Sequence, residues 1–377
     1  MKCIINGKII MKDGLLEGKA LLFDEIIHGF VDVSPEGAEV IDAESGYVSP
    51  GLIDVHCHGF MGWDASHGSL DELRRMSRRA AKFGVTSWLP TTMTLDWPVL
   101  ERCFAAIREA QRDSLSNEWN GAQVLGCHAE GPFINPKKKG AQAESSIQRP
   151  DAEKLRPWAD VIRLMTLAPE MDGAIDCIRV AREMGITLSM GHTNASYDQT
   201  VAGIDAGVTH ATHTFNAMPP LNHREPGAVG AALGDSRVYC ELICDTFHVH
   251  PALFTMMAKV AGDRLVLITD SIPAAGLPDG PHDQLGATVI VDGMKLRFPD
   301  GTIAGSALTL DAAVRNFARH SGLPIWRAAN LASLNPARSI GVDDRKGALE
   351  AGKDADVVIT DEDFNVRATY VRGRRVV

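Results

Sequence analysis

The chain has 377 residues, 45% of them hydrophobic, and a net charge of −10. These values suit a globular protein with one large domain and a small accessory one. The acidic balance argues against a general nucleic-acid binder, and the sequence contains no uninterrupted apolar stretch long enough to suggest a membrane span. The first residues lack the features of a signal peptide, and seven scattered cysteines favour a reducing compartment over a disulfide framework. We therefore expect a cytoplasmic protein.

Short strands and turns are expected at both chain ends. Asn6-Gly7 lies between two apolar runs and predicts a hairpin there, and further strand-like runs cover residues 18–23 and 38–42. Residues 355–360 and 369–377 have the same character. We expect residues 1–50 and 346–377 to form one small β-sandwich domain that is discontinuous in sequence.

Strand-like and helix-like segments alternate between the two ends. Eight such units predict a parallel sheet that closes into a (β/α)8 barrel over residues 51–345. The expected strands are 52–55, 87–91, 124–127, 161–167, 187–190, 209–212, 239–245 and 265–269. The expected helices include 69–83, 98–112, 173–184, 250–261, 312–320 and 325–331. Asp292-Gly293 predicts a hairpin of residues 287–298, inserted after the eighth strand and close to the active site.

Five of these strands end in a residue that can bind a metal or carry a proton. All strand carboxyl ends of a barrel open onto one face, so we expect these residues to converge there. Imidazole and carboxylate groups bind zinc, iron, manganese or cobalt. The residues are His56 and His58, Glu130, His192, His213 and Asp270.

Other interpretations of these residues stay open. His56 and His58 are two residues apart, so both rings point to the same side of a strand, as a metal pair would require. Glu130, before a Gly-Pro turn, fits either a ligand or a solvated loop residue. Asp270 fits either a catalytic acid–base or a helix N-cap. His210, deeper in its strand than His213, is interpreted as a core histidine.

The chain resembles the amidohydrolase superfamily and, within it, the N-acetylglucosamine-6-phosphate deacetylase family. The resemblance covers essentially the whole chain. The Pro-Gly-Leu-Ile-Asp-Val-His-Cys-His segment is a superfamily signature, whereas Phe-Asn-Ala-Met and Arg-Glu-Pro-Gly are more specific to the deacetylases. The segments that carry the resemblance are residues 50–59, 128–133, 139–141, 191–195, 209–218, 223–227, 247–249, 269–270 and 304–308.

The resemblance implies a metal-dependent TIM-barrel hydrolase with one or two divalent metals, zinc or iron foremost. Glu130, His192 and His213 would be the principal ligands, and His56 and His58 would bind a second metal that only some members retain. Asp270 would be the general base and acid, and His248 would contact the acetamide. The expected sugar-binding residues are Ala141, Asn216, Ala217, Ile303, Ala304 and Gly305.

The implied reaction is the hydrolysis of N-acetyl-D-glucosamine 6-phosphate to D-glucosamine 6-phosphate and acetate, in amino-sugar catabolism and cell-wall sugar recycling. His223 and Arg224 would bind the phosphate, because a guanidinium matches its oxygens. Some members take part of this clamp from the neighbouring subunit, so we expect a functional homodimer. The Lys137-Lys138-Lys139 run fits either a solvated loop or a contact with an anionic substrate.

Three positions depart from the family pattern: Gln142 stands where a histidine is frequent, Thr246 where glycine is common, and Ser271 where alanine is frequent. None of them removes an expected ligand. Two rival functions remain. A cyclic amidase or nucleobase deaminase would share the metal residues but would have no use for a phosphate clamp. A non-catalytic scaffold would need no ligands, whereas this chain has the whole set.

Overall fold

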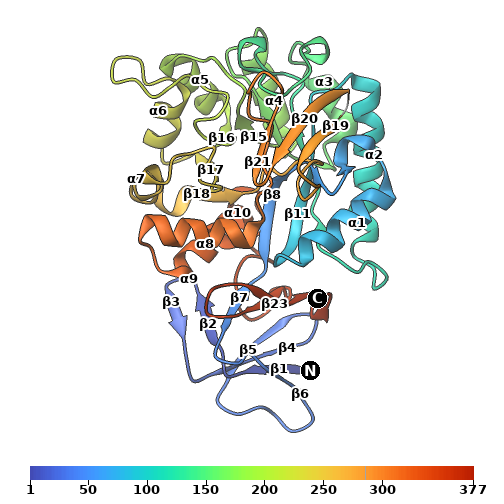
Figure 1. Cartoon of the computed structure of the whole chain (residues 1–377), viewed down its shortest axis with the longest axis vertical. Coiled ribbons are helices and arrows are strands. Elements are labelled where there is room, and N and C mark those ends of the chain that lie inside the picture. Colours follow the sequence, from blue (N-terminus) through green and yellow to red (C-terminus); the bar gives the residue numbers. More distant parts are fainter. Residues whose placement is uncertain (285) are drawn as a thin grey trace.

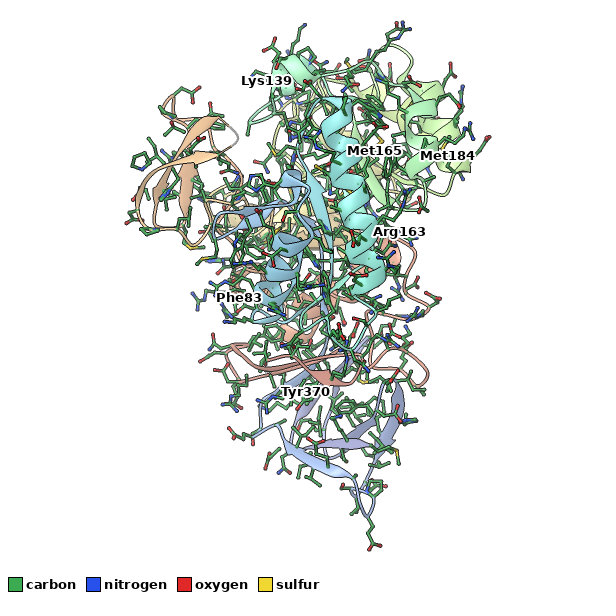
Figure 2. The ribbon with its side chains drawn as sticks, turned by 90° about the vertical axis from the view of Figure 1, so that its right-hand side faces the viewer. Phe83, Lys139, Arg163, Met165, Met184 and Tyr370 are labelled. Atoms are coloured by element: carbon green, nitrogen blue, oxygen red, sulfur yellow. The ribbon has the colours of Figure 1, made fainter. Side chains whose placement is uncertain are left out.

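The computed structural model describes residues 1–284 and 286–377 of the chain, and Figure 1 shows its two parts. A barrel surrounded by helices forms the larger part, and sheets from the chain ends lie below it (Figure 1). Figure 2 places Lys139 near the top of the molecule, far from Tyr370, which belongs to the lower part. No helix among the described residues has the length and apolarity needed to cross a membrane.

Eight parallel strands build the barrel in chain order, as the sequence predicts. Its two edges join beyond the last strand, where the backbone N–H of Asp270 donates to His56 O at 2.8 Å and that of His58 donates to Ser271 O at 2.8 Å. The strands are almost entirely buried, as a parallel sheet covered on both faces requires. They are β8 (Leu52–Cys57), β11 (Val85–Thr92), β13 (Cys127–Glu130), β14 (Ile162–Leu167), β15 (Thr187–Met190), β16 (Val208–Ala211), β17 (Tyr239–Ile243) and β18 (Leu265–Ile268).

The third barrel strand differs from its expected bounds of 124–127. It is split into β12 (Gln123–Val124) and β13, because Gly126 adopts a φ of 140° that breaks the extended run. Glu130 consequently occupies the last position of β13 instead of following the strand. This shift places the carboxylate at the mouth of the barrel.

Helices cover the outside of the barrel (Figure 1). In α1, for example, Ser69 caps the first turn and the buried side is lined by Leu73, Met76 and Ala80. The α-helices are α1 (Leu70–Ala81), α2 (Trp97–Asp113), α3 (Ala152–Leu155), α4 (Ala174–Glu183), α5 (Tyr197–Ala206), α6 (Gly227–Gly234), α7 (Ala252–Val260), α8 (Leu310–Ser321), α9 (Ile325–Leu331) and α10 (Leu334–Ser339). The 3₁₀ helices are η1 (Ala65–His67), η2 (Pro136–Lys138), η3 (Glu144–Ser146), η4 (Arg156–Trp158) and η5 (Gly262–Arg264).

Strands from both chain ends pair in one six-stranded sheet, ordered β24-β23-β22-β7-β2-β3, and a four-stranded sheet, ordered β5-β4-β1-β6, lies with it. One apolar core draws on both sheets, including Ile4, Ile9 and Val357. The strands are β1 (Lys2–Ile5), β2 (Lys8–Met11), β3 (Gly14–Leu16), β4 (Ala20–Phe23), β5 (Ile27–Val31), β6 (Glu39–Asp42), β7 (Tyr47–Pro50), β22 (Val357–Thr360), β23 (Val366–Val371) and β24 (Arg374–Arg375). The division of the chain at residues 50 and 345 stays a prediction.

The prediction of a hairpin at Asn6-Gly7 is wrong. Strands β1 and β2 belong to different sheets, and β2 forms its hairpin with β3 instead. Asn6 does adopt a left-handed φ of 56°, but its amide donates to Asp42 at 2.9 Å and directs the chain from one sheet to the other. The dipeptide signals a tight turn correctly, yet it does not decide which strands pair.

Gly51 joins the lower sheet directly to the barrel. It is the single residue between β7 and β8, and a Cβ there would lie 2.0 Å from Thr86 Oγ1. The chain therefore passes from the terminal sheet into the first barrel strand without a loop, and only glycine fits the crossing.

The insertion after β18 is a three-stranded antiparallel sheet of β19 (Gly280–Gln284), β20 (Ala287–Asp292) and β21 (Lys295–Arg297). It contains the expected hairpin, with Asp292 opposite Lys295. Val289, Val291 and Leu296 pack against Ile272 and Ala304, so this sheet rests on the segment that follows Asp270. A short hairpin of β9 (Gly59–Phe60) and β10 (Trp63–Asp64) follows β8.

Candidate active site

Glu130 lies among four histidines at the carboxyl end of the barrel. Its Oε1 is 3.1 Å from His192 Nε2, 3.1 Å from His213 Nε2 and 3.4 Å from His56 Nε2. Its Oε2 is 3.3 Å from His58 Nε2. These residues come from β8, β13 and the ends of β15 and β16, so the expected convergence of strand ends occurs.

Asp270 completes the cluster from the end of β18. Its Oδ1 is 3.4 Å from His56 Nε2 and 3.5 Å from His58 Nε2. His192, His213 and Asp270 have φ values of 46°, 31° and 49°, a left-handed conformation that non-glycine residues rarely adopt. Such local strain is typical of functional sites, where the surrounding structure holds side chains in a required direction.

In three of these histidines the Nδ1 atom, on the side of the ring away from Glu130, forms a hydrogen bond. His58 Nδ1 lies 3.1 Å from Thr91 O, and His192 Nδ1 lies 2.8 Å from Lys138 O. Because carbonyl oxygens only accept, Nδ1 carries the proton in both rings. His56 Nδ1 lies 2.9 Å from a carboxylate oxygen of Glu241, which imposes the same arrangement. Each ring therefore turns Nε2 toward Glu130, the usual arrangement of a metal-binding histidine.

The ring nitrogens need positive charge between them. The Nε2 atoms of His192 and His213 lie 3.2 Å apart, and those of His56 and His58 lie 3.3 Å apart. Burial lowers the pKa of His56, but the charges of Asp270, Glu241 and Glu130 raise it to about 9 overall. Burial also lowers the pKa of His58, but the carboxylates of Asp270 and Glu130 outweigh that effect and raise the pKa to about 10. Protons or a cation must fill this space.

The donors fit a divalent metal ion. Three buried groups have mutually close ligand atoms: Glu130 with His192 and His213, Glu130 with His56 and His58, and Glu241 with His56 and His128. Although burial alone would raise both carboxyl pKa values, the histidines hold that of Glu130 well below its usual range and that of Asp270 at about 2. A set of imidazoles and ionised carboxylates suits zinc or iron better than magnesium or calcium.

Gln142, one of the departures from the family pattern, contacts this cluster directly. Its amide nitrogen donates to Glu130 Oε2, and its Oε1 accepts from the backbone N–H of Thr94 at 2.6 Å. Gln142 is buried and thus fixes the orientation of the Glu130 carboxylate. The side chains of the other two departures make no contact with the expected ligands among the described hydrogen bonds: Ser271 Oγ donates to Gly59 O at 3.0 Å, although the Ser271 carbonyl accepts from the His58 backbone, and Thr246 has a left-handed φ of 66°.

A pocket opens above the cluster and gathers most of the expected substrate residues. Its lining contains His58, Glu130, Ala141, His192, His213, Asn216, Ala217, His248, Asp270, Ile303 and Gly305, together with Lys137, Lys138 and Gln142. Ala304 is on the lining of an adjoining pocket beside the β19–β21 sheet, which Ala141 also lines. The insertion therefore stands beside the substrate pocket, as expected.

His248 is oriented by Asp245. The Asp245 Oδ2 atom lies 2.6 Å from His248 Nδ1, and its Oδ1 accepts the backbone N–H groups of Phe247 and His248 at 2.8 Å each. The carboxylate thus fixes the turn after β17 and the tautomer of the ring, which leaves Nε2 for the pocket.

His223 and Arg224 are exposed and do not belong to the lining of this pocket. Lys138, in contrast, lines the pocket, and its Nζ donates to Met218 O at 3.2 Å. The expected phosphate residues thus do not line the pocket that contains the metal residues of the same chain.

Sequence reasoning missed Glu241, Thr91 and Asp245, which hold the rings of His56, His58 and His248. Only Glu241 gives a signal, as a lone acidic residue within the apolar run of β17. His210 is fully buried, as expected of a core histidine, and its Nε2 lies 3.8 Å from Glu241 Oε1.

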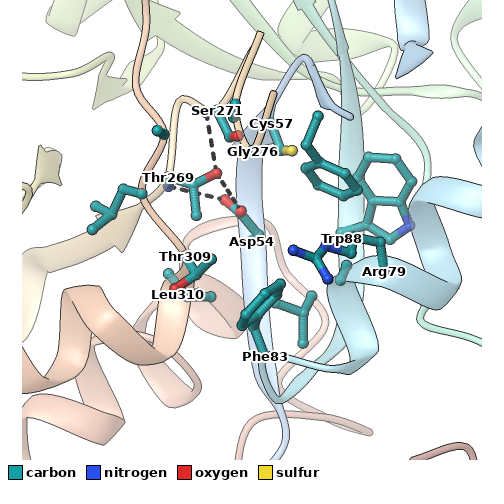
Figure 3. A pocket seen from close by; sticks show the side chains of 16 residues that line it. Asp54, Cys57, Arg79, Phe83, Trp88, Thr269, Ser271, Gly276, Thr309 and Leu310 are labelled. Carbon is teal, nitrogen blue, oxygen red and sulfur yellow. Dashed lines mark hydrogen bonds between the residues drawn. The ribbon is translucent and has the colours of Figure 1, made fainter. Parts of the chain in front are cut away.

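A smaller pocket shares no lining residue with the substrate pocket (Figure 3). Asp54 faces it from β8, and its Oδ2 accepts from Thr269 Oγ1 at 2.6 Å. Burial raises the pKa of Asp54 to about 6, although Thr269 and the His56 backbone oppose the shift. Asp54 joins the first and last barrel strands directly below the histidines.

Comparisons with known proteins agree with this arrangement. The amidohydrolase family profile matches residues 47–376. The N-acetylglucosamine-6-phosphate deacetylase of Bacillus subtilis (strain 168) is 38% identical over 348 residues, covering 90% of this chain and 87% of the relative. The N-acetylgalactosamine-6-phosphate deacetylase of Escherichia coli O157:H7 is 37% identical over 371 residues, 97% of each chain. The crystal structure of N-acetylglucosamine-6-phosphate deacetylase from Pasteurella multocida superposes with a TM-score of 0.93 at 33% identity and covers 99% of both chains.

Proposed function

The chain belongs to the amidohydrolase family, and on that premise we propose that it hydrolyses the acetamide of N-acetyl-D-glucosamine 6-phosphate. The products are D-glucosamine 6-phosphate and acetate. The observation that carries this proposal is the pocket floor, where Glu130 lies among four histidines with Asp270 at their edge. We also propose that the chain works in the cytoplasm, since its seven cysteines are free thiols.

Glu130, His192 and His213 would hold one divalent cation, and His56 and His58 a second, with zinc or iron preferred. The cation would supply positive charge that makes water more acidic and polarises an amide carbonyl. Gln142 supports this site because it restricts the Glu130 carboxylate to one orientation.

Asp270 would take the proton of the attacking water and return it to the departing amine. Its ionised state at neutral pH suits the first step, and its place on the pocket lining gives it access to both groups. His248, held by Asp245, would donate a hydrogen bond to the acetamide oxygen and stabilise the charge that develops there. Backbone groups of Ala141, Ala217 and residues 303–305 would orient the sugar.

His223 and Arg224 would bind the phosphate from the neighbouring subunit of a homodimer. Both side chains are exposed and lie outside the pocket of their own chain, which fits a role across an interface. A guanidinium and an imidazole at a pocket rim are suited to a dianionic phosphate.

The relatives named above act on two epimers, the glucosamine and the galactosamine derivative. We favour the glucosamine derivative as the substrate of this chain. A cyclic amidase or deaminase remains the rival, because it would use the same metal residues.

Acetate release decides between these functions. Purified protein is incubated with N-acetylglucosamine 6-phosphate, its galactosamine epimer or unphosphorylated N-acetylglucosamine, before and after removal of metal by a chelator. We expect fast, metal-dependent release from the phosphorylated glucosamine derivative. Faster release from the epimer would reassign the substrate, and no release from any sugar by metal-loaded protein would contradict the proposal.

A further inference from the structure

Glu241 is a fully buried carboxylate in β17, surrounded in sequence by apolar residues. Its Oε2 atom has two partners: the His56 ring, whose Nδ1 lies 2.9 Å away, and the backbone N–H of His213, which donates at 3.0 Å. Glu241 does not line the substrate pocket, so it contacts neither the sugar nor the reacting amide.

These two partners belong to different halves of the metal cluster. His56 is one of the β8 pair, and His213 belongs to the group of Glu130 and His192. One oxygen of Glu241 therefore fixes a ring in the first half and a backbone position in the second.

The remaining oxygen of Glu241 has no conventional structural role. Oε1 forms no hydrogen bond within the described part of the chain, and its nearest basic group, His210 Nε2, is 3.8 Å away. A buried carboxylate is unfavourable unless strong hydrogen bonds compensate, and here both compensating bonds come from expected metal ligands. Stability of the barrel alone would be better served by an apolar residue at this place.

We propose that Glu241 is a positioning residue. It keeps His56 in the Nδ1-protonated tautomer and thereby strengthens cation binding at the His56–His58 pair. This inference rests on the metal part of the proposed function. Without Glu241, the His56 ring can protonate Nε2 or rotate, and in either case its lone pair leaves the direction of Glu130 and Asp270. His58, which is held by the Thr91 carbonyl, cannot compensate alone.

Two variants separate positioning from simple support of the core. Glu241→Leu removes both hydrogen bonds but fills the space with apolar atoms. Glu241→Gln retains an oxygen that can accept from the His56 ring and the His213 backbone. A matched control is Asp356→Asn, which neutralises a buried carboxylate just before β22 of the terminal sheet, while Lys346 still contacts Asp354 at 3.0 Å.

Metal content per chain is measured after saturation with zinc and desalting, and zinc affinity by competition with a chromophoric chelator. We expect two zinc ions in the wild-type protein and in Glu241→Gln, but one in Glu241→Leu, with affinity for the lost ion reduced about 10- to 100-fold. The control should retain two. Circular dichroism and melting of the metal-free proteins establish that each variant folds.

Two zinc ions of unchanged affinity in folded Glu241→Leu would overturn the inference, and so would a wild-type protein that binds only one. If Glu241→Leu does not fold, Glu241→Ala replaces it under the same criterion. Metal content is measured without substrate. A failure of the acetate-release assay would therefore contradict the proposed reaction, but it would not affect the conclusion about Glu241 and zinc binding.

Discussion

Asp270 occupies the point where the proposed chemistry needs a proton carrier. The carboxylate lines the pocket and lies 3.4 Å from His56 Nε2 and 3.5 Å from His58 Nε2. An amide in its place keeps the shape and one oxygen but cannot accept and return a proton. A conservative change to asparagine can therefore test proton transfer by Asp270 apart from metal binding by its neighbours.

We expect Asp270→Asn to lower kcat by about 100- to 10,000-fold, the usual contribution of general acid–base catalysis, without loss of bound metal. Acetate release and elemental analysis of the same preparation measure the two effects. Asp263→Asn, an exposed change just before β18, serves as the control. Retained turnover in Asp270→Asn would remove this residue from the proposed role.

The positions of the metal residues could be predicted from the sequence because each ends an apolar strand run, and barrel geometry brings such ends together. The groups behind them could not. Thr91 acts through its backbone carbonyl, which any residue would supply, and Glu241 acts through a contact 185 positions away in the sequence from His56. Gln142 is visible as a departure, but its bond to Glu130 depends on how the 131–148 loop folds.

At the scale of elements, strands with a clear apolar pattern are predictable and those without it are not. All eight barrel strands occur within a few residues of their expected bounds. Strand β19 was not expected, because Gly280-Pro-His-Asp-Gln has no apolar alternation and its residues are at least partly exposed. It forms because β20 offers a partner. A tertiary partner of this kind leaves no local signal.

The turn between β17 and α7 carries strain that can be tested. Thr246 is exposed, with a φ of 66° that glycine adopts freely and threonine does not. We expect Thr246→Gly to stabilise the fold by up to about 1 kcal/mol, since the relief exceeds the entropy that glycine adds to the unfolded chain. Thermal melting measures the change. Thr255→Gly serves as the control: it places glycine inside α7 and should lower the stability of the fold. A lower melting temperature for Thr246→Gly would contradict this explanation.

At the scale of the whole molecule, His223 and Arg224, the proposed phosphate-binding residues, are exposed and lie outside the pocket of their own chain. Arg224→Ala should raise the KM for the phosphorylated sugar at least about tenfold, because a charge-assisted contact of about 1.5–3 kcal/mol is lost. Its slow reaction with the unphosphorylated sugar should not change. Steady-state kinetics on both sugars, with Arg179→Ala of α4 as the exposed control, provide the measurement. An unchanged KM would exclude Arg224 from the clamp.

The proposed dimer adds a second readout for Arg224. A mixture of Arg224→Ala with Asp270→Asn chains should regain activity if subunits exchange, because one pocket then has an intact Asp270 and an intact neighbouring Arg224. No recovery after exchange, shown by mixed species in native mass spectrometry, would place both residues in the same chain's site.

The end of the barrel is tied to the terminal sheet by ion pairs. Lys346 Nζ lies 3.0 Å from Asp354 and 2.7 Å from Asp356, and Arg345 lies 2.9 Å from Asp354. Burial would raise the pKa of Asp354, but the charge of Lys346 and the Arg345 hydrogen bond hold it below its usual value. A lowered carboxyl pKa means that the ionised form stabilises the fold.

This stabilisation is fully present above the unfolded pKa of about 3.9 and is lost as the pH falls through the lower folded value. We therefore expect Asp354→Asn to cost about 1–2 kcal/mol at pH 6, with the difference from wild type closing below about pH 4. Urea unfolding followed at several pH values measures it. A gap that widens toward low pH would show that the pair contributes in another way.

The direct passage from β7 through Gly51 into β8 makes the two parts of the molecule thermodynamically linked. β8 carries His56 and ends at Cys57, directly before His58, and β7 pairs with β22 near the other chain end. A cation that binds only when β8 is in place stabilises β7 by mass action, in proportion to the logarithm of its free concentration. Slowed amide exchange in β22 should therefore report occupancy of a metal centre that β22 never touches.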